Sequence, residues 1–368
     1  GTRDGLVGCS EGLSGAGAQS SEPAAGTGMT AATAAPVFDH LLWMSDRRGT
    51  FEHACLADPR PEHGYCTDDM ARVLIVATRQ PDAEGLVNGL AGAAVRFLND
   101  AQAFTGACRN RMDRAGRWID EPSTGDHWGR CVWGLGTAAA HSDVSLVGRL
   151  AVIQLERAAQ ARSTSRRAMA FAALGAAELL AVDPEHRVAR KLITDCAAVL
   201  PTPNADPAWP WPEARLAYAN AVLPEAMIAA GVALDDPALT QRGLDLLGWL
   251  VEYETSDGHL SVTPVGGRGV DDSRPGFDQQ PIEVATLADA CARAAVVDAS
   301  AIWTDTVRAA AAWFMGDNDA GEPMWDPATG GGYDGLHADG VNSNQGAEST
   351  LAVISTLQHA YRLSTVPQ

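Results

Sequence analysis

The stretch GYCTDDMARVLIVATR, residues 64–79, joins an aspartate-rich polar start to a long apolar continuation. Thr67 followed by Asp68 and Asp69 is a typical helix start, because a hydroxyl caps the first N–H groups and acids favour the positive end of the helix dipole. Capping explains Thr67 and one acid, but it leaves the second acid and the preceding Tyr65 without a role. We therefore interpret this stretch as a helix whose first turn also carries functional side chains.

Five further polar clusters stand in front of alanine- and leucine-rich runs in the same way. They are DHWGR at 126–130, RSTSRR at 162–167, WPWPE at 209–213 running on to Tyr218 and Asn220, FDQQPIE at 277–283 and NSNQGAE at 342–348. The helices between them start plainly, since Asp183-Pro184 and Asp236-Pro237 are each an N-cap followed by proline at the first helical position. This alternation predicts an all-α fold, an (α/α)6 barrel of six helical hairpins, whose inner helices all begin at one pocket.

Residues 36–364 are expected to form a single domain of about a dozen helices. The expected helices are 36–45, 67–79, 84–103, 127–140, 145–161, 166–182, 185–199, 214–231, 237–253, 279–296, 300–315 and 345–363. Two long connections, 255–276 and 317–343, are expected to be loops over the active face, because long irregular segments in compact domains often bind ligands. Residues 1–35 are small and polar, which predicts disorder, and Met29 is a candidate start of translation.

Composition excludes several classes of function. The formal charge of −19 and the pI near 4.7 disfavour nucleic acid and anionic membranes as partners. Lys191 is the only lysine and lies in an ordinary amphipathic segment, which argues against a Schiff-base mechanism or a Walker-type phosphate loop. The sequence shows no membrane-spanning apolar run and no export signal, so we expect a cytoplasmic protein. The ten tryptophans suit stacking against sugar rings, although many tryptophans simply fill cores.

Metal ligation and terpene chemistry are weaker interpretations. His53, Cys55, His63 and Cys66 are zinc-ligand types, but their spacing matches no standard zinc site. DNDAG at 317–321 resembles the start of a calcium loop that lacks its closing glutamate. The paired aspartates would suit a terpene synthase only in an apolar pocket, whereas amides and tryptophans predict a polar one. We expect neither a metal nor a cofactor.

Several motifs together resemble one bacterial carbohydrate-active family. They are EHA at 52–54, GYCTDD at 64–69 with Ala71-Arg72, DQQPIE at 278–283, and GGGYDGL at 330–336 followed by NQGAEST at 344–350. The chain resembles, from about residue 38 to 361, an α/α-toroid family whose members occur fused to, or near, retaining glycosyltransferases and β-mannoside phosphorylases. The resemblance implies an (α/α)6 barrel and a glycan ligand. Relatives carry an acid-rich segment after the tryptophan of the fourth cluster, whereas this chain has Pro212-Glu213-Ala214 and so departs from the family pattern at Glu213.

We interpret the protein as a glycoside hydrolase, or a related glycosyl-transferring enzyme, acting on an oligosaccharide. Such chemistry requires one carboxylic acid to protonate the leaving oxygen and one carboxylate to act as base or nucleophile. The predicted catalytic residues are Asp68, Asp69, Glu283 and Glu348, with either aspartate facing either glutamate. Substrate contacts are expected from aromatic, amide and charged side chains of the same clusters, namely His63, Tyr65, His127, Trp128, Arg130, Arg166, Trp211, Tyr218, Asn220, Asp278, Gln279, Gln280, Tyr333, Asp334, His337, Asn344 and Gln345.

Two alternatives use the same fold. A sugar epimerase or isomerase would use histidine as its base, and His63, His127 or His337 are the candidates. A non-catalytic glycan-binding module is the expectation if no two carboxylates in the pocket lie within about 10 Å of each other.

Overall fold

Twelve α-helices dominate the computed structural model, which describes residues 34–83 and 85–365. They are α1 (Asp39–Trp43), α2 (Thr67–Arg79), α3 (Gly85–Ala101), α4 (Asp126–His141), α5 (Ser145–Ala158), α6 (Arg166–Val182), α7 (Arg187–Ala197), α8 (Val222–Ala233), α9 (Pro237–Tyr253), α10 (Pro281–Val297), α11 (Ala301–Phe314) and α12 (Ala347–Thr365). The prediction of an all-α barrel is confirmed. The largest difference is at α8, expected from residue 214, because Ala219 has a left-handed backbone with φ 44° that no helix can contain.

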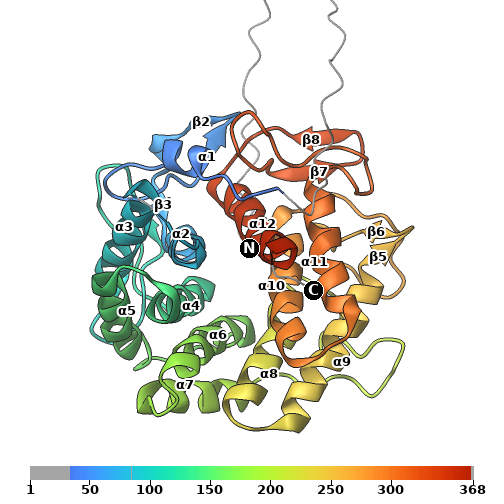
Figure 1. The fold of residues 1–368 in the computed structure, drawn as a ribbon, viewed down its shortest axis with the longest axis horizontal. Helices are drawn as coiled ribbons and strands as arrows, with labels where there is room; N and C mark the ends of the chain where they lie inside the picture. Colours follow the sequence, from blue (N-terminus) through green and yellow to red (C-terminus); the bar gives the residue numbers. More distant parts are fainter. Residues whose placement is uncertain (1–33, 84, 366–368) are drawn as a thin grey trace, which may run out of the picture.

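The helices form two concentric rings (Figure 1). The even-numbered helices form the inner ring, in which each helix contacts the next and α12 contacts α2. The odd-numbered helices lie outside them, so the chain alternates between outer and inner helices. The inner helices therefore all run in the same direction, and their first turns meet at one end of the barrel.

Eight short strands form four antiparallel pairs in the connections. They are β1 (Ala54–Cys55) with β2 (Asp58–Pro59), β3 (Tyr65–Cys66) with β4 (Arg111–Met112), β5 (Thr255–Ser256) with β6 (His259–Leu260), and β7 (Gly335–His337) with β8 (Gly340–Asn342). A 3-10 turn spans Pro61–His63. Two of these pairs, β5–β6 and β7–β8, lie in the long connections expected to be loops.

The helix caps agree with the sequence in part. Asp236 caps α9 as expected, accepting a hydrogen bond from the backbone N–H of Leu239 at 3.0 Å. The expected caps of two other helices are wrong. The α2 cap is the Cys66 thiol, while Thr67 donates to the carbonyl of Arg109. The α7 cap is the His186 ring, since the preceding Asp183 ends α6.

Glycine sets the separation of α4 and α6. A Cβ atom on Gly136 would overlap the carbonyl oxygen of Gly175, and one on Gly175 would overlap the carbonyl oxygen of Val132. The two helix backbones are therefore in direct contact at this point of the inner ring.

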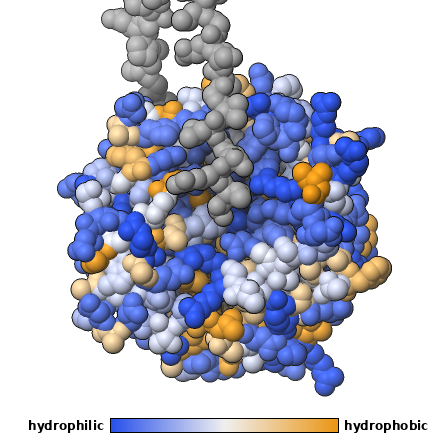
Figure 2. Space-filling model, turned by 180° about the vertical axis from the view of Figure 1, so that it is seen from behind, coloured by the Kyte–Doolittle hydropathy of each residue, from blue (hydrophilic) through white to orange (hydrophobic). Residues whose placement is uncertain are grey.

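The predicted disorder of residues 1–35 concerns residues outside the described part, apart from Ala34 and Ala35; Ala34 is buried in the core. Among the described helices, none combines the length and the hydrophobicity required to cross a bilayer. Seen from the side opposite to Figure 1, the surface is mostly hydrophilic, with small scattered hydrophobic patches (Figure 2).

Candidate functional site

Charged side chains from the starts of α2, α4 and α12 meet at one end of the inner ring. Arg72 donates through Nη1 to Asp69 at 2.9 Å and forms an ion pair through Nη2 with Glu348 at 2.7 Å. Arg130 donates through Nη1 to Asp68 at 3.0 Å. One guanidinium thus holds the carboxylates of Asp69 and Glu348 on its two terminal nitrogens, and a second holds Asp68. We call Asp68, Asp69, Arg72, Arg130, Tyr218 and Glu348 the charged cluster.

Tyr218 joins this cluster from the loop before α8. Arg130 donates through Nη2 to the Tyr218 hydroxyl. The same guanidinium lies over the ring of Phe171 at 4.4 Å and near the ring of Tyr218 at 5.2 Å, so it is held by cation–π contacts as well. Because its position is fixed by two rings and two hydrogen bonds, Arg130 is a rigid part of the site.

The two adjacent aspartates have pKa values shifted in opposite directions. Burial acts to raise the pKa of Asp68, but the positive charges of Arg130 and Arg72 outweigh it, and the pKa is lowered. Burial also raises the pKa of Asp69, here to about 6. The positive charge of Arg72 only partly offsets this increase, and the nearby carboxylates of Glu52 and Glu348 add to it. The two adjacent carboxyl groups therefore lose their protons over different pH ranges, with Asp69 the more readily protonated.

Glu283 does not join the charged cluster; it binds the backbone that carries Tyr218. Its Oε1 accepts the N–H of Ala219 at 2.6 Å, and its Oε2 accepts the N–H and the side-chain amide of Asn220 at 3.2 and 3.1 Å. Burial and the charge of Glu254 raise its pKa to about 8, against the effect of these hydrogen bonds. The geometry gives Glu283 a positioning role for residues 218–220.

Arg167 holds the same segment from α6. Its guanidinium contacts both oxygens of Glu213 at 3.0 and 2.8 Å and donates through Nε to the carbonyl of Tyr218 at 2.6 Å. The sequence pointed instead to Arg166, which is exposed to solvent. Arg166 and Arg167 are separated by about 100° around the helix, and the sequence does not reveal which of them faces inward.

Four residues expected to contact substrate lie in the core instead. Trp128 and Trp211 have no exposed surface, and the Trp128 indole donates to the carbonyl of Ala158 at 3.2 Å. Tyr65 is 1% exposed and its hydroxyl donates to Asp46 at 2.9 Å. His127 is buried with Nε2 on the carbonyl of Cys108 at 2.9 Å. These contacts contradict their assignment as sugar platforms or, for His127, as a base.

The amide side chains mainly organise the loops. Gln279 is fully buried and donates to the carboxylate of Asp319 at 2.6 Å. Gln345 donates to Asp326 at 3.0 Å, and Asn344 accepts the N–H of Leu56 at 2.9 Å. These three amides are therefore already used in protein contacts. The side-chain amide of Asn220 is also engaged, because it donates to Glu283.

The remaining expected residues lie at the same end of the barrel. Asp334 accepts the N–H of Gly346 at 2.9 Å and the hydroxyl of Ser349 at 2.5 Å at the start of α12, and burial raises its pKa to about 6. Burial raises the pKa of Asp278, against the effect of His337 nearby. The others are partly or fully exposed, namely Gln280 in front of α10, Tyr333 before β7, His337 at the end of β7, and His63, whose ring contacts that of His53 with a centroid distance of 5.0 Å.

Glu52, Cys66 and Asp69 offer the one candidate metal site among the described residues, with ligand atoms within 4.8 Å of one another. Arg111 already contacts the Glu52 carboxylate and Arg72 that of Asp69. Burial raises the pKa of the Cys66 thiol well above its usual value. In this structure the two carboxylates of the set are thus paired with arginines and not with each other.

The sequence motifs include Arg72 without giving it a role, and they do not indicate that Glu52 is a neighbour of Asp69. Arg72 follows Asp69 by three residues, which places both on one helix face. That spacing is a signal, but only the structure shows that Glu348 reaches the same guanidinium.

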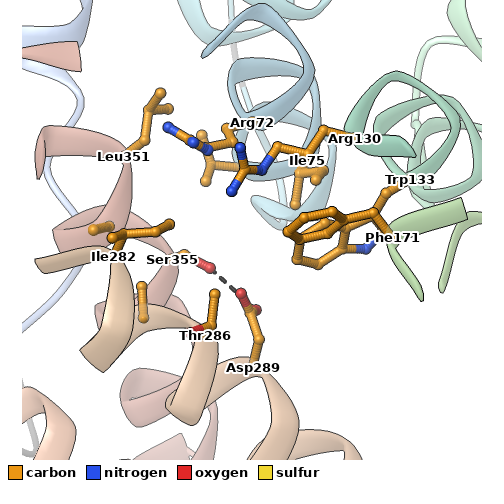
Figure 3. A pocket seen from close by; sticks show the side chains of 13 residues that line it. Arg72, Ile75, Arg130, Trp133, Phe171, Ile282, Thr286, Asp289, Leu351 and Ser355 are labelled. Carbon is orange, nitrogen blue, oxygen red and sulfur yellow. Dashed lines mark hydrogen bonds between the residues drawn. The ribbon is translucent and has the colours of Figure 1, made fainter. Parts of the chain in front are cut away.

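A cavity continues from the cluster into the barrel (Figure 3). Arg72 and Arg130 lie at one end of it, and Thr286, Asp289 and Ser355 lie at the other. Its walls are apolar and aromatic side chains, including Ile75, Trp133, Phe171, Ile282 and Leu351. The cluster therefore opens onto a cavity with apolar walls and a polar far end.

No family model matches this chain, and no curated protein matches it in sequence. Its fold is similar to that of a sugar epimerase from a ruminal bacterium, with 13% identity and a TM-score of 0.67 over 90% of this chain and 96% of that one. A cellobiose 2-epimerase from Bacillus thermoamylovorans is 11% identical, with a TM-score of 0.66 over 88% and 95% of the two chains.

An α-1,6-mannanase of glycoside hydrolase family 76 from Salegentibacter, solved with α-1,6-mannotetrose, is 11% identical, with a TM-score of 0.57 over 88% and 96%. At sequence identities this low, the similarity shows the (α/α)6 fold alone. The three similar proteins are carbohydrate-active enzymes, two of them epimerases and one a glycoside hydrolase.

Proposed function

We propose that this protein is a glycoside hydrolase, or a closely related glycosyl-transferring enzyme, that acts on an oligosaccharide. The observation that carries the proposal is the placement of Asp69 and Glu348 on the two terminal nitrogens of Arg72. A guanidinium is small and planar, so two carboxylates that share it lie within the roughly 5–10 Å separation that glycoside hydrolysis uses.

The environments of the two carboxyl groups suggest their roles. Asp69 is buried and its raised pKa keeps part of it protonated near neutral pH, as a proton donor to the leaving oxygen requires. Glu348 has a side chain that is 41% exposed, so it can reach a water molecule or a sugar carbon. Asp69 would protonate the glycosidic oxygen while Glu348 accepts a proton from the attacking water or attacks the anomeric carbon itself.

The other members of the cluster would hold the sugar. The lowered pKa of Asp68 keeps it ionised, so it can accept hydrogen bonds from sugar hydroxyls. Tyr218 and Arg130, fixed by Glu283 and by Phe171, would donate to the same ring. An epimerase, the alternative function, would need a histidine base, and this alternative has weaker support. The Nε2 of His127 binds a backbone carbonyl, and His63 lies outside the charged cluster.

The test is product analysis with a panel of oligosaccharides, with and without phosphate, alongside the corresponding free reducing sugars. We expect shortened oligosaccharides among the products. Comparing the reactions with and without phosphate shows whether water or phosphate is the acceptor. An epimer or ketose formed from a free sugar, with every oligosaccharide left intact, would contradict it. Asp69→Asn serves as the matched inactive control, because the amide keeps size but cannot donate the proton.

A further inference from the structure

Four aromatic side chains gather beside the last turns of α9, outside the charged cluster. They are Trp209 and Trp211 of the WPWPE stretch, and Trp249 and Tyr253 of α9 itself. Their neighbouring ring centroids are 4.9 to 6.2 Å apart. We call these four residues the aromatic cluster. The proposed function gives none of them a role.

Three of the rings stack in series from the core towards the surface. Trp211 is fully buried and stacks on Trp249 with a centroid distance of 6.2 Å. Trp249 stacks in turn on Tyr253 at 4.9 Å, and both of these side chains are partly exposed. Trp211 therefore belongs to the core, whereas Tyr253 lies at the surface end of the series.

Arg274 lies over the Tyr253 ring. Its guanidinium carbon is 3.8 Å from the ring centroid, and its side chain is exposed to solvent. Because Trp249 stacks on one face of Tyr253, Arg274 covers the other. Among the described residues, the Arg274 guanidinium has no hydrogen-bond or ion-pair partner, so the cation–π contact alone holds it there. Such a contact at an exposed site amounts to only about a two- to fivefold preference for the stacked position.

The aromatic cluster lies at the same end of the barrel as the charged cluster. The outer helix α9 runs opposite to the inner helices, so its last turn lies where they begin. The Tyr253 hydroxyl donates to the carbonyl of Gly269 at 3.0 Å. The adjacent Arg268 exchanges two backbone hydrogen bonds with Leu216, at 2.8 and 3.0 Å, and Leu216 precedes Tyr218 of the charged cluster by two residues. A short series of hydrogen-bonded residues thus joins the two clusters.

The free face of an aromatic ring suits a sugar. The C–H groups on one face of a hexose are apolar and pack flat on such a ring, in the position that the planar guanidinium takes here. Asp271 and Ser273, both exposed, lie in the same loop as Arg274 and are groups that hydrogen-bond to hydroxyls. Asp271 and the net charge of −19 favour a neutral sugar over an acidic one.

We propose that the aromatic cluster is a subsite for a distal sugar unit of the oligosaccharide, with Tyr253 as its stacking platform. Arg274 occupies this platform in the structure, and a bound sugar would take its place. The inference rests on the proposed function, because one oligosaccharide would extend from the charged cluster to Tyr253. The substrate is then a chain longer than a disaccharide.

The test is isothermal titration of the full chain carrying Asp69→Asn, so that oligosaccharides stay intact. The probes are the two-unit and six-unit members of four series, namely β-1,4-linked glucose, α-1,4-linked glucose, β-1,4-linked mannose and β-1,4-linked xylose. In at least one series, the six-unit probe should bind at least about tenfold more tightly than the two-unit probe, because only the longer chain reaches both clusters.

Three variants locate the subsite. Tyr253→Ala should weaken six-unit binding at least about fivefold and leave two-unit binding unchanged, whereas Tyr253→Phe keeps the ring and should bind like the parent. Arg274→Ala uncovers the platform and should tighten six-unit binding about two- to fivefold. Because Arg274 is exposed, its variant tests the proposal even if Tyr253→Ala does not fold. Arg242→Ala, at another exposed position of α9, is the control and should change nothing.

Equal affinities for the two lengths in every series, no binding of any probe, or weaker six-unit binding in Arg274→Ala would overturn the proposal. Turnover by the parent protein separates this failure from that of the proposed function. Cleavage that depends neither on chain length nor on Tyr253 would show that only the subsite is wrong. Tight binding of long chains through Tyr253 without cleavage would show that only the hydrolase assignment is wrong.

Discussion

Glu283 holds Ala219 in a left-handed backbone conformation by accepting its N–H at 2.6 Å. The neighbouring N–H of Asn220 binds the other carboxylate oxygen, so two successive backbone donors require two acceptor oxygens. A left-handed alanine is unfavourable by about 1 kcal/mol, and this double acceptor offsets that cost. The position of Tyr218 in the site thus depends on a carboxylate that does not itself join the charged cluster.

Glu283→Gln tests this relationship. The amide nitrogen would face a backbone N–H, so we expect a loss of about 1–3 kcal/mol in unfolding free energy and at least about a tenfold drop in turnover. Chemical denaturation and steady-state kinetics measure both. Because Glu283 only positions Tyr218, the pH dependence of the remaining activity should match that of the parent. Glu252→Gln, at an exposed site on α9, is the control.

The proposed acid and base are tested by amide substitution. Asp69→Asn and Glu348→Gln keep size and shape but cannot exchange a proton, so turnover should fall by about 10² or more while oligosaccharide binding persists. Asp68→Asn should raise KM more than it lowers kcat if Asp68 only holds the sugar. Near-normal turnover in all three variants would rule out this pair of roles.

The raised pKa of Asp69 predicts a pH profile. An acid catalyst must be protonated, so kcat/KM should decline as pH rises through about 6. Glu52 is one of the charges that raise this pKa, and Glu52→Gln should therefore move the decline to lower pH. Glu62→Gln, an exposed acid on the 3-10 turn, should leave the profile in place. A decline that moves to higher pH in the Glu52 variant would contradict the assignment.

The two long connections are expected to respond to ligand together. Bridges link Gln279, in front of α10, to Pro264 in the first connection and to Leu336 in the second. Hydrogen exchange with and without a bound oligosaccharide should therefore show protection in both 255–276 and 317–343. Unchanged exchange in both segments at saturating ligand would argue against a lid, and protection of only one would show that Gln279 does not couple them.

The sequence predicted the helices well because alanine- and leucine-rich runs leave few alternatives. It also placed Asp68, Asp69 and Glu348 at one end of the barrel, because all three lie in first turns. It failed on side-chain direction. Trp128 and Arg130 are two positions apart, so they point to nearly opposite sides of α4. Because Arg130 faces the barrel axis, the Trp128 indole must point outward to α5. The order of residues in the cluster does not by itself reveal this difference in direction.

Glu283 shows a second limit of the sequence. Its position in a first turn resembles that of Glu348, yet one binds a backbone segment and the other an arginine. Which of the two occurs depends on the path of residues 213–221, an irregular segment where no periodicity exists to guide a prediction.

The contact between Gly136 and Gly175 has a consequence for redesign of this protein. The helices that carry Arg130 and Arg167 touch there without side chains between them, so a larger residue at either glycine would force the two backbones apart. Reshaping the mouth of the barrel at α4 and α6 would therefore break this contact. Room for new specificity is available instead on the opposite arc, where the loops before α10 and α12 can be exchanged while the glycine contact serves as an unmoving reference.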